Sequence, residues 1–283
     1  EYIPGVNILK YLSYEGTNTI SLRGAASREN LIQIDGIDIY DSFTGTTDLN
    51  TIDIANIKRI EIVKGGLSSI YGENASSGVV NIITGSDKMN ILKANFYYGS
   101  NNVQRISLVS NNRIFDINYT LSGIEEKSPG YMENSSYLKR SGYIKINFKN
   151  PYMESTISGY YFKRNKDIPM NQFGLSPDAH QYDENFHIGL NENIDTGFIK
   201  GKVMTYYKSA DLKYVDTSWG INDRHIKKEI KTRVMGIYNE NKSISLITGY
   251  EYYKKDIKST KTKSESLYNN ATFSNISIIL FNA

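Results

Sequence analysis

LIQIDGIDIY, residues 31–40, consists of two apolar runs separated by Asp35-Gly36. A type I′ turn needs positive φ at both central residues, and Asp-Gly is one of the pairs that meet this need. The stretch therefore predicts a tight β-hairpin, with one strand on each side of the turn.

The residues around this hairpin predict a small mixed α/β unit over residues 1–85. Residues 53–57 can form a short helical turn, and residues 57–63 alternate like a strand with Ile57, Ile60 or Ile62 inward. Residues 79–83 predict another buried strand. The intervening glycines precede no Gly-Lys-Ser or Gly-Lys-Thr, so they indicate tight turns rather than a phosphate-binding loop.

From about residue 90 onward the sequence predicts long strands in which apolar and polar residues alternate. In residues 244–252, for example, Ile244, Leu246 and Tyr250 oppose Ser245 and Glu251. About ten strands of about ten residues fit, and that length lets a tilted strand cross a bilayer. A soluble antiparallel sheet with one wet face is the alternative reading. Strands are expected at 91–99, 104–110, 114–121, 144–148, 154–162, 185–191, 197–207, 232–238, 244–252 and 276–280.

The connections predict an asymmetry between the two ends of this sheet. Long polar loops are expected at 125–140, 165–183 and 214–228, alternating with short turns at 111–112 and 149–150. Long loops on one side and tight turns on the other are typical of outer-membrane barrels.

Composition excludes several other functions. The 283 residues include no Cys, 23 Tyr and a net charge of +3, so there is no thiolate chemistry and no basic stripe for nucleic acid. The three histidines have no metal-ligand spacing, and no catalytic triad or carboxylate pair stands out. The sequence therefore predicts neither an enzyme nor a bound cofactor or metal. Abundant Tyr suits the aromatic girdles of a membrane barrel, and equally a glycan-binding β-sandwich.

Two segments carry a family resemblance. ISLRGAASRENLIQIDGIDIYD (residues 20–41) resembles the plug segment of TonB-dependent outer-membrane receptors. IANIKRIEIVKGGLSSIYGENASSGVVNIIT (residues 54–84) resembles the second plug signature of that family, in the expected order. The vitamin B12 and small-siderophore receptors look most similar. Two positions depart from the pattern, because the family usually has Arg at Lys64 and often Pro at Gly66.

The resemblance implies a mixed α/β plug domain at residues 1–85 and the first part of an antiparallel transmembrane β-barrel at residues 86–283. The parent barrel would have 22 strands. We therefore expect a fragment that holds most of the plug and an open, partial barrel. Arg23 and Arg59 match the two plug arginines that in the family face glutamates of the inner barrel wall, here on strands beyond this chain.

By the same resemblance, the outward plug loops would hold the substrate through Tyr11, Tyr14, Ser42, Phe43 and Thr44. Aromatic rings and small hydroxyl groups suit a bulky chelate with a mixed surface. The implied function is active import of a metal chelate, a corrinoid or an iron-siderophore, across the bacterial outer membrane. The implied partners are TonB, the chelate and outer-membrane lipid. A soluble or surface β-rich glycan-binding protein is the main alternative.

Overall fold

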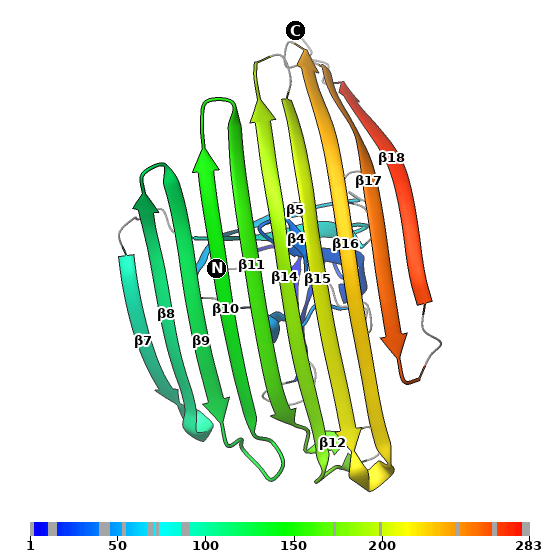
Figure 1. Cartoon of the computed structure of the whole chain (residues 1–283). Helices are drawn as coiled ribbons and strands as arrows, with labels where there is room; N and C mark the ends of the chain where they lie inside the picture. The colour runs from blue at the N-terminus through cyan, green and yellow to red at the C-terminus, as the bar shows by residue number, and fades with distance from the viewer. Residues whose placement is uncertain are drawn as a thin grey trace.

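A computed structural model describes residues 3–10, 16–39, 46–52, 55–66, 71, 74–85, 91–171, 174–197, 200–240, 244–261 and 265–278. Its elements divide into a compact N-terminal unit and one very large antiparallel sheet (Figure 1). The strands and 3-10 helices of the N-terminal unit are β1 (Val6–Lys10), β2 (Asn18–Leu22), η1 (Ser27–Glu29), β3 (Asn30–Ile34), β4 (Ile37–Asp38), η2 (Leu49–Thr51), β5 (Ile57–Lys64) and β6 (Gly78–Thr84).

The N-terminal unit is built on a mixed four-stranded sheet in the order β4-β3-β6-β5. Strands β3 and β6 are parallel, whereas β3–β4 and β5–β6 are antiparallel. A separate β1–β2 hairpin packs beside it, since Ile20 and Leu22 share a core with Ile32 and Val80. The mixed unit is thus present, and its described helical residues are the 3-10 turns η1 and η2 and the α-helical Tyr71.

The hairpin predicted at Asp35-Gly36 is confirmed. Both residues have positive φ, 50° at Asp35 and 83° at Gly36, and Ile34 pairs with Ile37 across the turn. Strand β4 is only two residues long, so the hairpin works as a short projecting tip rather than as a long ribbon.

Strand β5 confirms residues 57–63 as a strand and shows which of its isoleucines the core covers. Ile57 and Ile62 pack against the core, whereas Ile60 is 53% exposed. Ile57 and Ile62 are five residues apart and could not share a face under strict alternation. A register shift between Ile57 and Arg59 inserts the extra residue that puts both on the same side.

The large sheet contains ten antiparallel strands in the order β18-β17-β16-β15-β14-β11-β10-β9-β8-β7. It remains open among the described residues, with β7 and β18 at its edges. Its strands are β7 (Ile91–Gly99), β8 (Val103–Ile114), β9 (Ile117–Ser128), β10 (Tyr137–Lys149), β11 (Met153–Asp167), β14 (Ala179–Asp195), β15 (Lys200–Asp216), β16 (Ile221–Glu240), β17 (Ile244–Ser259) and β18 (Glu265–Ile278).

Two local expectations for this sheet were wrong. The strand expected at 114–121 is split, because Phe115 has a φ of 53° and forms the turn between β8 and β9 with Asp116. The expected turn at 111–112 lies inside β8. Phe115 continues the apolar–polar alternation expected of a strand, but it lies in the turn and is 91% exposed.

The loops are also shorter than expected, because polar residues continue the strands. Residues 129–136 connect β9 to β10, and only 217–220, which form η4 (Thr217–Trp219) and Gly220, connect β15 to β16. Residues 168–178 connect β11 to β14 and contain the small pair β12 (Met170–Asn171) and β13 (Gly174–Leu175). These loops share one end of the sheet with η3 (Ser100–Asn102), and the turns at 115–116 and 150–152 lie at the other (Figure 1).

The two faces of the large sheet differ in chemistry. On β8, Ile106 and Leu108 are 52% and 54% exposed on the outer face, whereas Ser107 and Val109 are buried. On β16, exposed Ile230 and Val234 alternate with buried Lys231 and Arg233. Further exposed apolar side chains of the outer face are Leu92, Phe96, Leu121, Ile144, Ile157, Tyr161, Phe186 and Ile188. The sheet is therefore apolar outside and polar inside, as in a membrane barrel.

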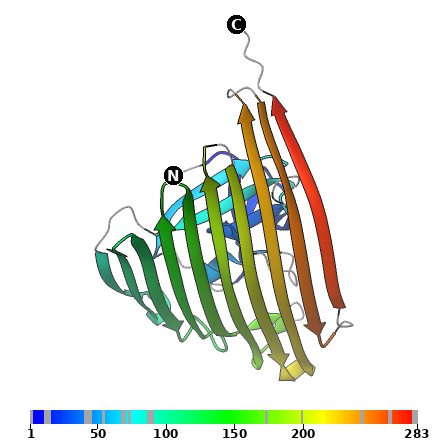
Figure 2. The same ribbon diagram turned by 45° about the horizontal axis from the view of Figure 1, so that its top comes forward.

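The N-terminal unit lies against the concave, polar face of the sheet (Figure 2). Three aromatic residues of the large sheet, Tyr143, Tyr160 and Phe162, are buried in the same cluster as Ile32 and Ile82 of the unit. The hydrophobic core therefore spans the contact between the two parts. In the described residues, no helix is long and apolar enough to cross a membrane.

Candidate functional site

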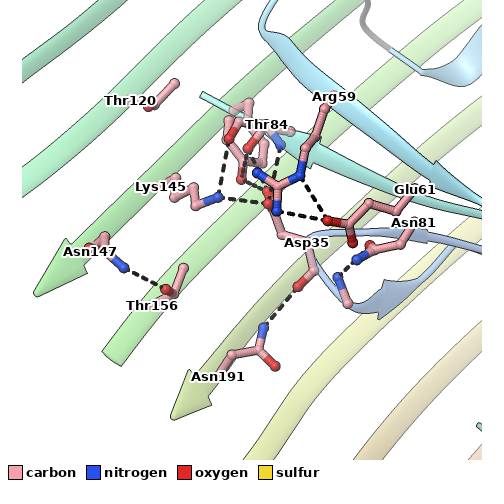
Figure 3. A network of polar contacts seen from close by, with 12 residues as sticks. Asp35, Arg59, Glu61, Asn81, Thr84, Thr120, Lys145, Asn147, Thr156 and Asn191 are labelled. Carbon is pink, nitrogen blue, oxygen red and sulfur yellow. Dashed lines mark hydrogen bonds and ion pairs between the residues drawn. The ribbon is translucent and has the colours of Figure 1, made fainter. Parts of the chain in front are cut away.

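Three aspartates of the N-terminal unit make ion pairs with the inner face of the sheet, which we call the wall. The first is Asp35 in the hairpin turn (Figure 3). Its Oδ1 lies 2.7 Å from Lys145 Nζ, and its Oδ2 accepts hydrogen bonds from Thr84 Oγ1 at 2.5 Å and from the Tyr143 hydroxyl. Asn191 Nδ2 donates to the backbone carbonyl of Asp35 at 2.9 Å. Wall side chains from β10 and β14 therefore hold the hairpin tip from two sides.

Asp38, at the end of β4, is the second contact. Its Oδ2 lies 3.2 Å from Lys231 Nζ and 3.1 Å from the Tyr206 hydroxyl, and its carbonyl accepts from Lys208 Nζ at 3.0 Å. Gln33 Nε2 donates to Oδ1 at 2.7 Å. Burial raises the pKa of Asp38, but Lys231, Gln33 and Lys208 outweigh burial, so this pKa lies below its ordinary value of 3.8.

Asp48 is the third contact and lies near the end of the wall that carries the longer loops. Its Oδ1 accepts hydrogen bonds from the backbone N–H groups of Asn50 and Asn18. The bond from Asn50 makes Asp48 the N-cap of η2. Its Oδ2 lies 3.0 Å from Nη1 of Arg164, whose Nε contacts Asp183 at 2.8 Å. Arg164 is 3% exposed, so this wall cation is buried between one carboxylate of the N-terminal unit and one carboxylate of the wall.

A close apolar fit accompanies these polar contacts. Ile37, fully buried, packs against Met204 and Tyr206 of β15. Gly189 of β14 leaves room for it, because a Cβ at this glycine would lie 2.6 Å from Ile37 Cδ1 and 3.1 Å from Tyr206 Cβ. A residue larger than glycine at position 189 would therefore push the hairpin away from the wall.

A cavity of about 100 Å³ lies between the N-terminal unit and the wall, beside Thr17 and Asp48. Its wall side includes Arg164, His187 and Lys208. His187 stacks on Tyr160 and is 3% exposed, and its Nε2 has no hydrogen-bond partner among the described residues. Because buried polar atoms are nearly always hydrogen-bonded, this cavity favours an occupant with a polar group facing His187.

The two arginines predicted to face wall glutamates make local contacts in the described part of the chain. Arg59 pairs with Glu61 on its own strand at 2.7 Å, and Arg23 donates its backbone N–H to Gly5 at 2.7 Å. Their predicted glutamates were expected on further strands, so that role stays a prediction. The predicted substrate residues Tyr11, Tyr14, Ser42, Phe43 and Thr44 all lie outside the described residues.

Sequence reasoning missed the contacts that the wall does make. It expected plug arginines against wall glutamates, whereas the described contacts join plug aspartates to wall lysines and an arginine. The available signal was the inward register of basic residues on β10, β11 and β16. Without the strand bounds, that register could not be separated from an ordinary charged outer face.

This geometry defines a class of architecture, a small mixed domain that plugs the concave side of a curved sheet with an apolar exterior. Residues 1–79 match the family model described as the TonB-dependent receptor plug domain. The chain contains a plug domain of the TonB-dependent receptor family, and its fold resembles the plug and part of the barrel of those receptors. The resemblance carried by the two sequence signatures is thereby confirmed.

Solved structures show the same fold. The copper transporter OprC is 13% identical with a TM-score of 0.75, and the match covers 96% of this chain and 47% of that one. The ferric citrate transporter FecA in its unliganded form is 16% identical with a TM-score of 0.69, covering 98% and 50%. The siderophore receptor PirA from Pseudomonas aeruginosa is 16% identical with a TM-score of 0.68, covering 98% and 54%. The chain thus spans about half the length of these structures.

Proposed function

We propose that this chain is the plug and part of the barrel wall of an outer-membrane receptor that imports a metal chelate. In this proposal residues 1–85 are the plug, and residues 86–283 supply the first strands of a barrel that has 22 strands when complete. The receptor binds its cargo and moves it, and this chain catalyses no reaction.

The observation that carries the proposal is the seating of the plug on a polar wall. Asp35, Asp38 and Asp48 meet buried or half-buried cations there, while the opposite face of the same sheet exposes Leu108, Ile230 and similar side chains. An apolar outer face suits lipid, and a plug that must move suits polar contacts, since each ion pair can be exchanged for water. A soluble protein would have little use for an extended apolar outer face.

The substrate site is proposed at the end of the plug that faces the longer loops. The plug segments at residues 9–17 and 41–49 hold Tyr11, Tyr14, Ser42, Phe43 and Thr44. The cavity beside Thr17 and Asp48 supports this location. The similar structures are described as transporters of copper or ferric citrate and as siderophore receptors, which supports a metal or its chelate as cargo. A corrinoid and an iron-siderophore are the two substrates proposed.

TonB is the proposed energy source. It would engage the full-length protein and draw the plug from the wall, while Arg23 and Arg59 contact glutamates on the remaining wall. Mutating either arginine to alanine in the full-length protein should weaken the hold on the plug without preventing folding of the four-stranded sheet.

Growth of a receptor-deficient bacterial strain tests the function directly. The strain carries the full-length gene and is given, in separate cultures, ferric siderophores as the only iron source or a corrinoid as the only vitamin. Growth on one of these chelates that also requires TonB supports import. A protein that is extracted without detergent, binds glycans and supports no growth would establish the glycan-binding alternative instead.

A further inference from the structure

A hollow on the outer face of the large sheet has a floor made by two glycines. Gly123 of β9 and Gly142 of β10 are cross-strand partners. A Cβ built on either glycine would have its nearest neighbour at 4.0 Å, so the space above this floor is open. Apolar side chains border the floor on three sides, and each is at least 39% exposed; they are Leu108, Leu121, Ile144 and Tyr161.

The fourth side of the hollow is charged. Arg140 and Glu125 pair across β10 and β9, in the row directly beyond the two glycines and towards the longer loops. Lys163 of β11 lies opposite Arg140, and its Nζ is 4.0 Å from Glu184 of β14. Two neighbouring cations therefore stand at the centre of this row, with one carboxylate on each outer side. The Tyr161 hydroxyl also reaches the row, because it donates to Glu184 at 3.2 Å.

The centre of the charged row suits an anion. Arg140 and Lys163 face each other directly on adjacent strands, an arrangement that is destabilising for like charges. A guanidinium has five N–H groups, so Arg140 can keep Glu125 on its Nε and still donate to another oxygen. The two side chains are 59% and 50% exposed, which leaves them accessible from outside the sheet. A phosphate group between them would offset their repulsion.

The width of the hollow decides what can occupy its apolar part. Neighbouring strands lie about 4.8 Å apart, so a floor one glycine pair wide admits a linear hydrocarbon chain. It is too narrow for a helix, whose diameter with side chains is about 10 Å. The hollow is also continuous with the apolar outer face, which in the proposed function faces lipid. A lipid with one chain in the hollow and an anionic headgroup on the charged row fits both parts.

We propose that this hollow binds a phosphate-bearing membrane lipid. One acyl chain lies over Gly123 and Gly142, and the phosphate lies between Arg140 and Lys163. Van der Waals contact holds the chain, as between apolar surfaces in a bilayer generally, and the cations select the headgroup. The inference rests on the membrane location in the proposed function and goes beyond import, because the site lies on the face of the sheet opposite the plug.

Native mass spectrometry of the full-length receptor in detergent tests the site. The lipid probes share the same two acyl chains; phosphatidic acid carries a phosphate monoester and diacylglycerol carries none. Inorganic phosphate is the third probe. Gly142→Leu fills the hollow, and Gly236→Leu adds the same side chain at an exposed glycine of β16 outside it. Arg140→Gln removes one cation of the row, and Arg113→Gln removes a similarly exposed and paired arginine near the opposite end of the sheet.

We expect the wild type to bind phosphatidic acid more tightly than diacylglycerol. Gly142→Leu should weaken the binding of both lipids about tenfold, because its side chain takes the space of the acyl chain. Arg140→Gln should weaken the binding of phosphatidic acid alone, about threefold, as expected for an exposed ionic contact. Gly236→Leu and Arg113→Gln should bind both lipids as the wild type does.

The other outcomes overturn the site in distinct ways. Equal binding by Gly142→Leu and Gly236→Leu removes the chain from the hollow, and equal binding by Arg140→Gln and Arg113→Gln removes the phosphate from the row. Displacement of phosphatidic acid by an equal concentration of inorganic phosphate would indicate a site for a free anion. A receptor dimer that Gly142→Leu abolishes would assign the hollow to a second copy. These results leave the import function standing, whereas a receptor that stays soluble without detergent overturns both.

Discussion

Asp38 of the plug and Lys231 of the wall are 193 residues apart in the chain, and their charged atoms lie 3.2 Å apart. Both side chains are buried, so the pair is far less screened by salt than a surface ion pair. Removing one partner of a buried pair leaves an uncompensated charge, which is much more costly than losing an exposed pair. Asp38 and Lys231 are therefore well suited to decide how firmly the plug is seated.

Replacing Asp38 with Asn should loosen the plug by about 1.5–3 kcal/mol, because buried Lys231 would lose its 3.2 Å contact with this carboxylate and keep only Glu251, at 3.5 Å. The measurement is hydrogen exchange of the β3 and β4 amides in the full-length receptor, in which faster exchange is expected. Asp116→Asn is the control, since Asp116 is 76% exposed in its pair with Arg113. Unchanged exchange in Asp38→Asn would contradict the assigned role.

Acid should release the same contact. The pKa of Asp38 is lowered in the folded protein, so its ion pair stabilises the seat above the ordinary value of 3.8. That stabilisation is lost as the pH falls through the still lower folded pKa. Exchange of the β3 amides, measured at a series of acidic pH values, should accelerate there in the wild type and much less in Asp38→Asn. Parallel profiles for the two proteins would count against Asp38 as the responsible group.

Arg164→Met should free the plug end that carries η2. It removes the buried cation between Asp48 and Asp183 and leaves both carboxylates without it, at a cost of about 3 kcal/mol or more. The readout is protease cleavage within residues 46–52 of the folded receptor. Arg140→Met, which breaks an exposed pair with Glu125, should cost less than about 1 kcal/mol and leave cleavage unchanged.

Gly189→Ala should disturb the hairpin through steric overlap. The new Cβ would meet Ile37 Cδ1 at 2.6 Å, and overpacking of this kind costs about 1–3 kcal/mol. Ile37→Val in the same molecule should recover part of the loss, which a double-mutant cycle of plug unfolding measures. Gly123→Ala is the matched control, because its nearest neighbour is Ser141 O at 4.0 Å.

Leu108→Arg tests the lipid-facing assignment. An arginine near the middle of the bilayer-facing surface of a barrel costs about 2–4 kcal/mol, so folding into lipid vesicles should become less favourable by that amount. Tyr131→Arg, in the loop between β9 and β10, should be almost neutral. Equal tolerance of both substitutions would argue against a lipid contact at Leu108.

The elements that the sequence predicted well depend on local chemistry. The turn at Asp35-Gly36 follows from the φ values that only a few residue pairs tolerate. The outward side chains of β9 and β10 follow from alternation, which places Leu121 and Ile144 on the outer face. The ends of the strands were harder to predict, because in the sequence the polar strand residues on the inner face of the sheet cannot be told from polar loop residues.

The seat of the plug could not be predicted, because it depends on pairs that only the folded chain brings together. Asp35 meets Lys145 across 110 positions, and Asp48 meets Arg164 across 116. Nothing in the spacing of these residues distinguishes them from exposed charges. The family pattern directed attention to Arg23 and Arg59 instead, whose predicted partners lie on strands expected beyond this chain.

The small hollow that Gly189 leaves for Ile37 has a consequence for repeated motion. Because Ile37 fits only where Gly189 leaves room for it, this contact fixes both the depth and the rotation of the plug against the wall. A plug that leaves and returns would find its original position by shape alone, before any charges re-form. Accurate return of the plug would then depend on the absence of a side chain at Gly189 as much as on any ion pair.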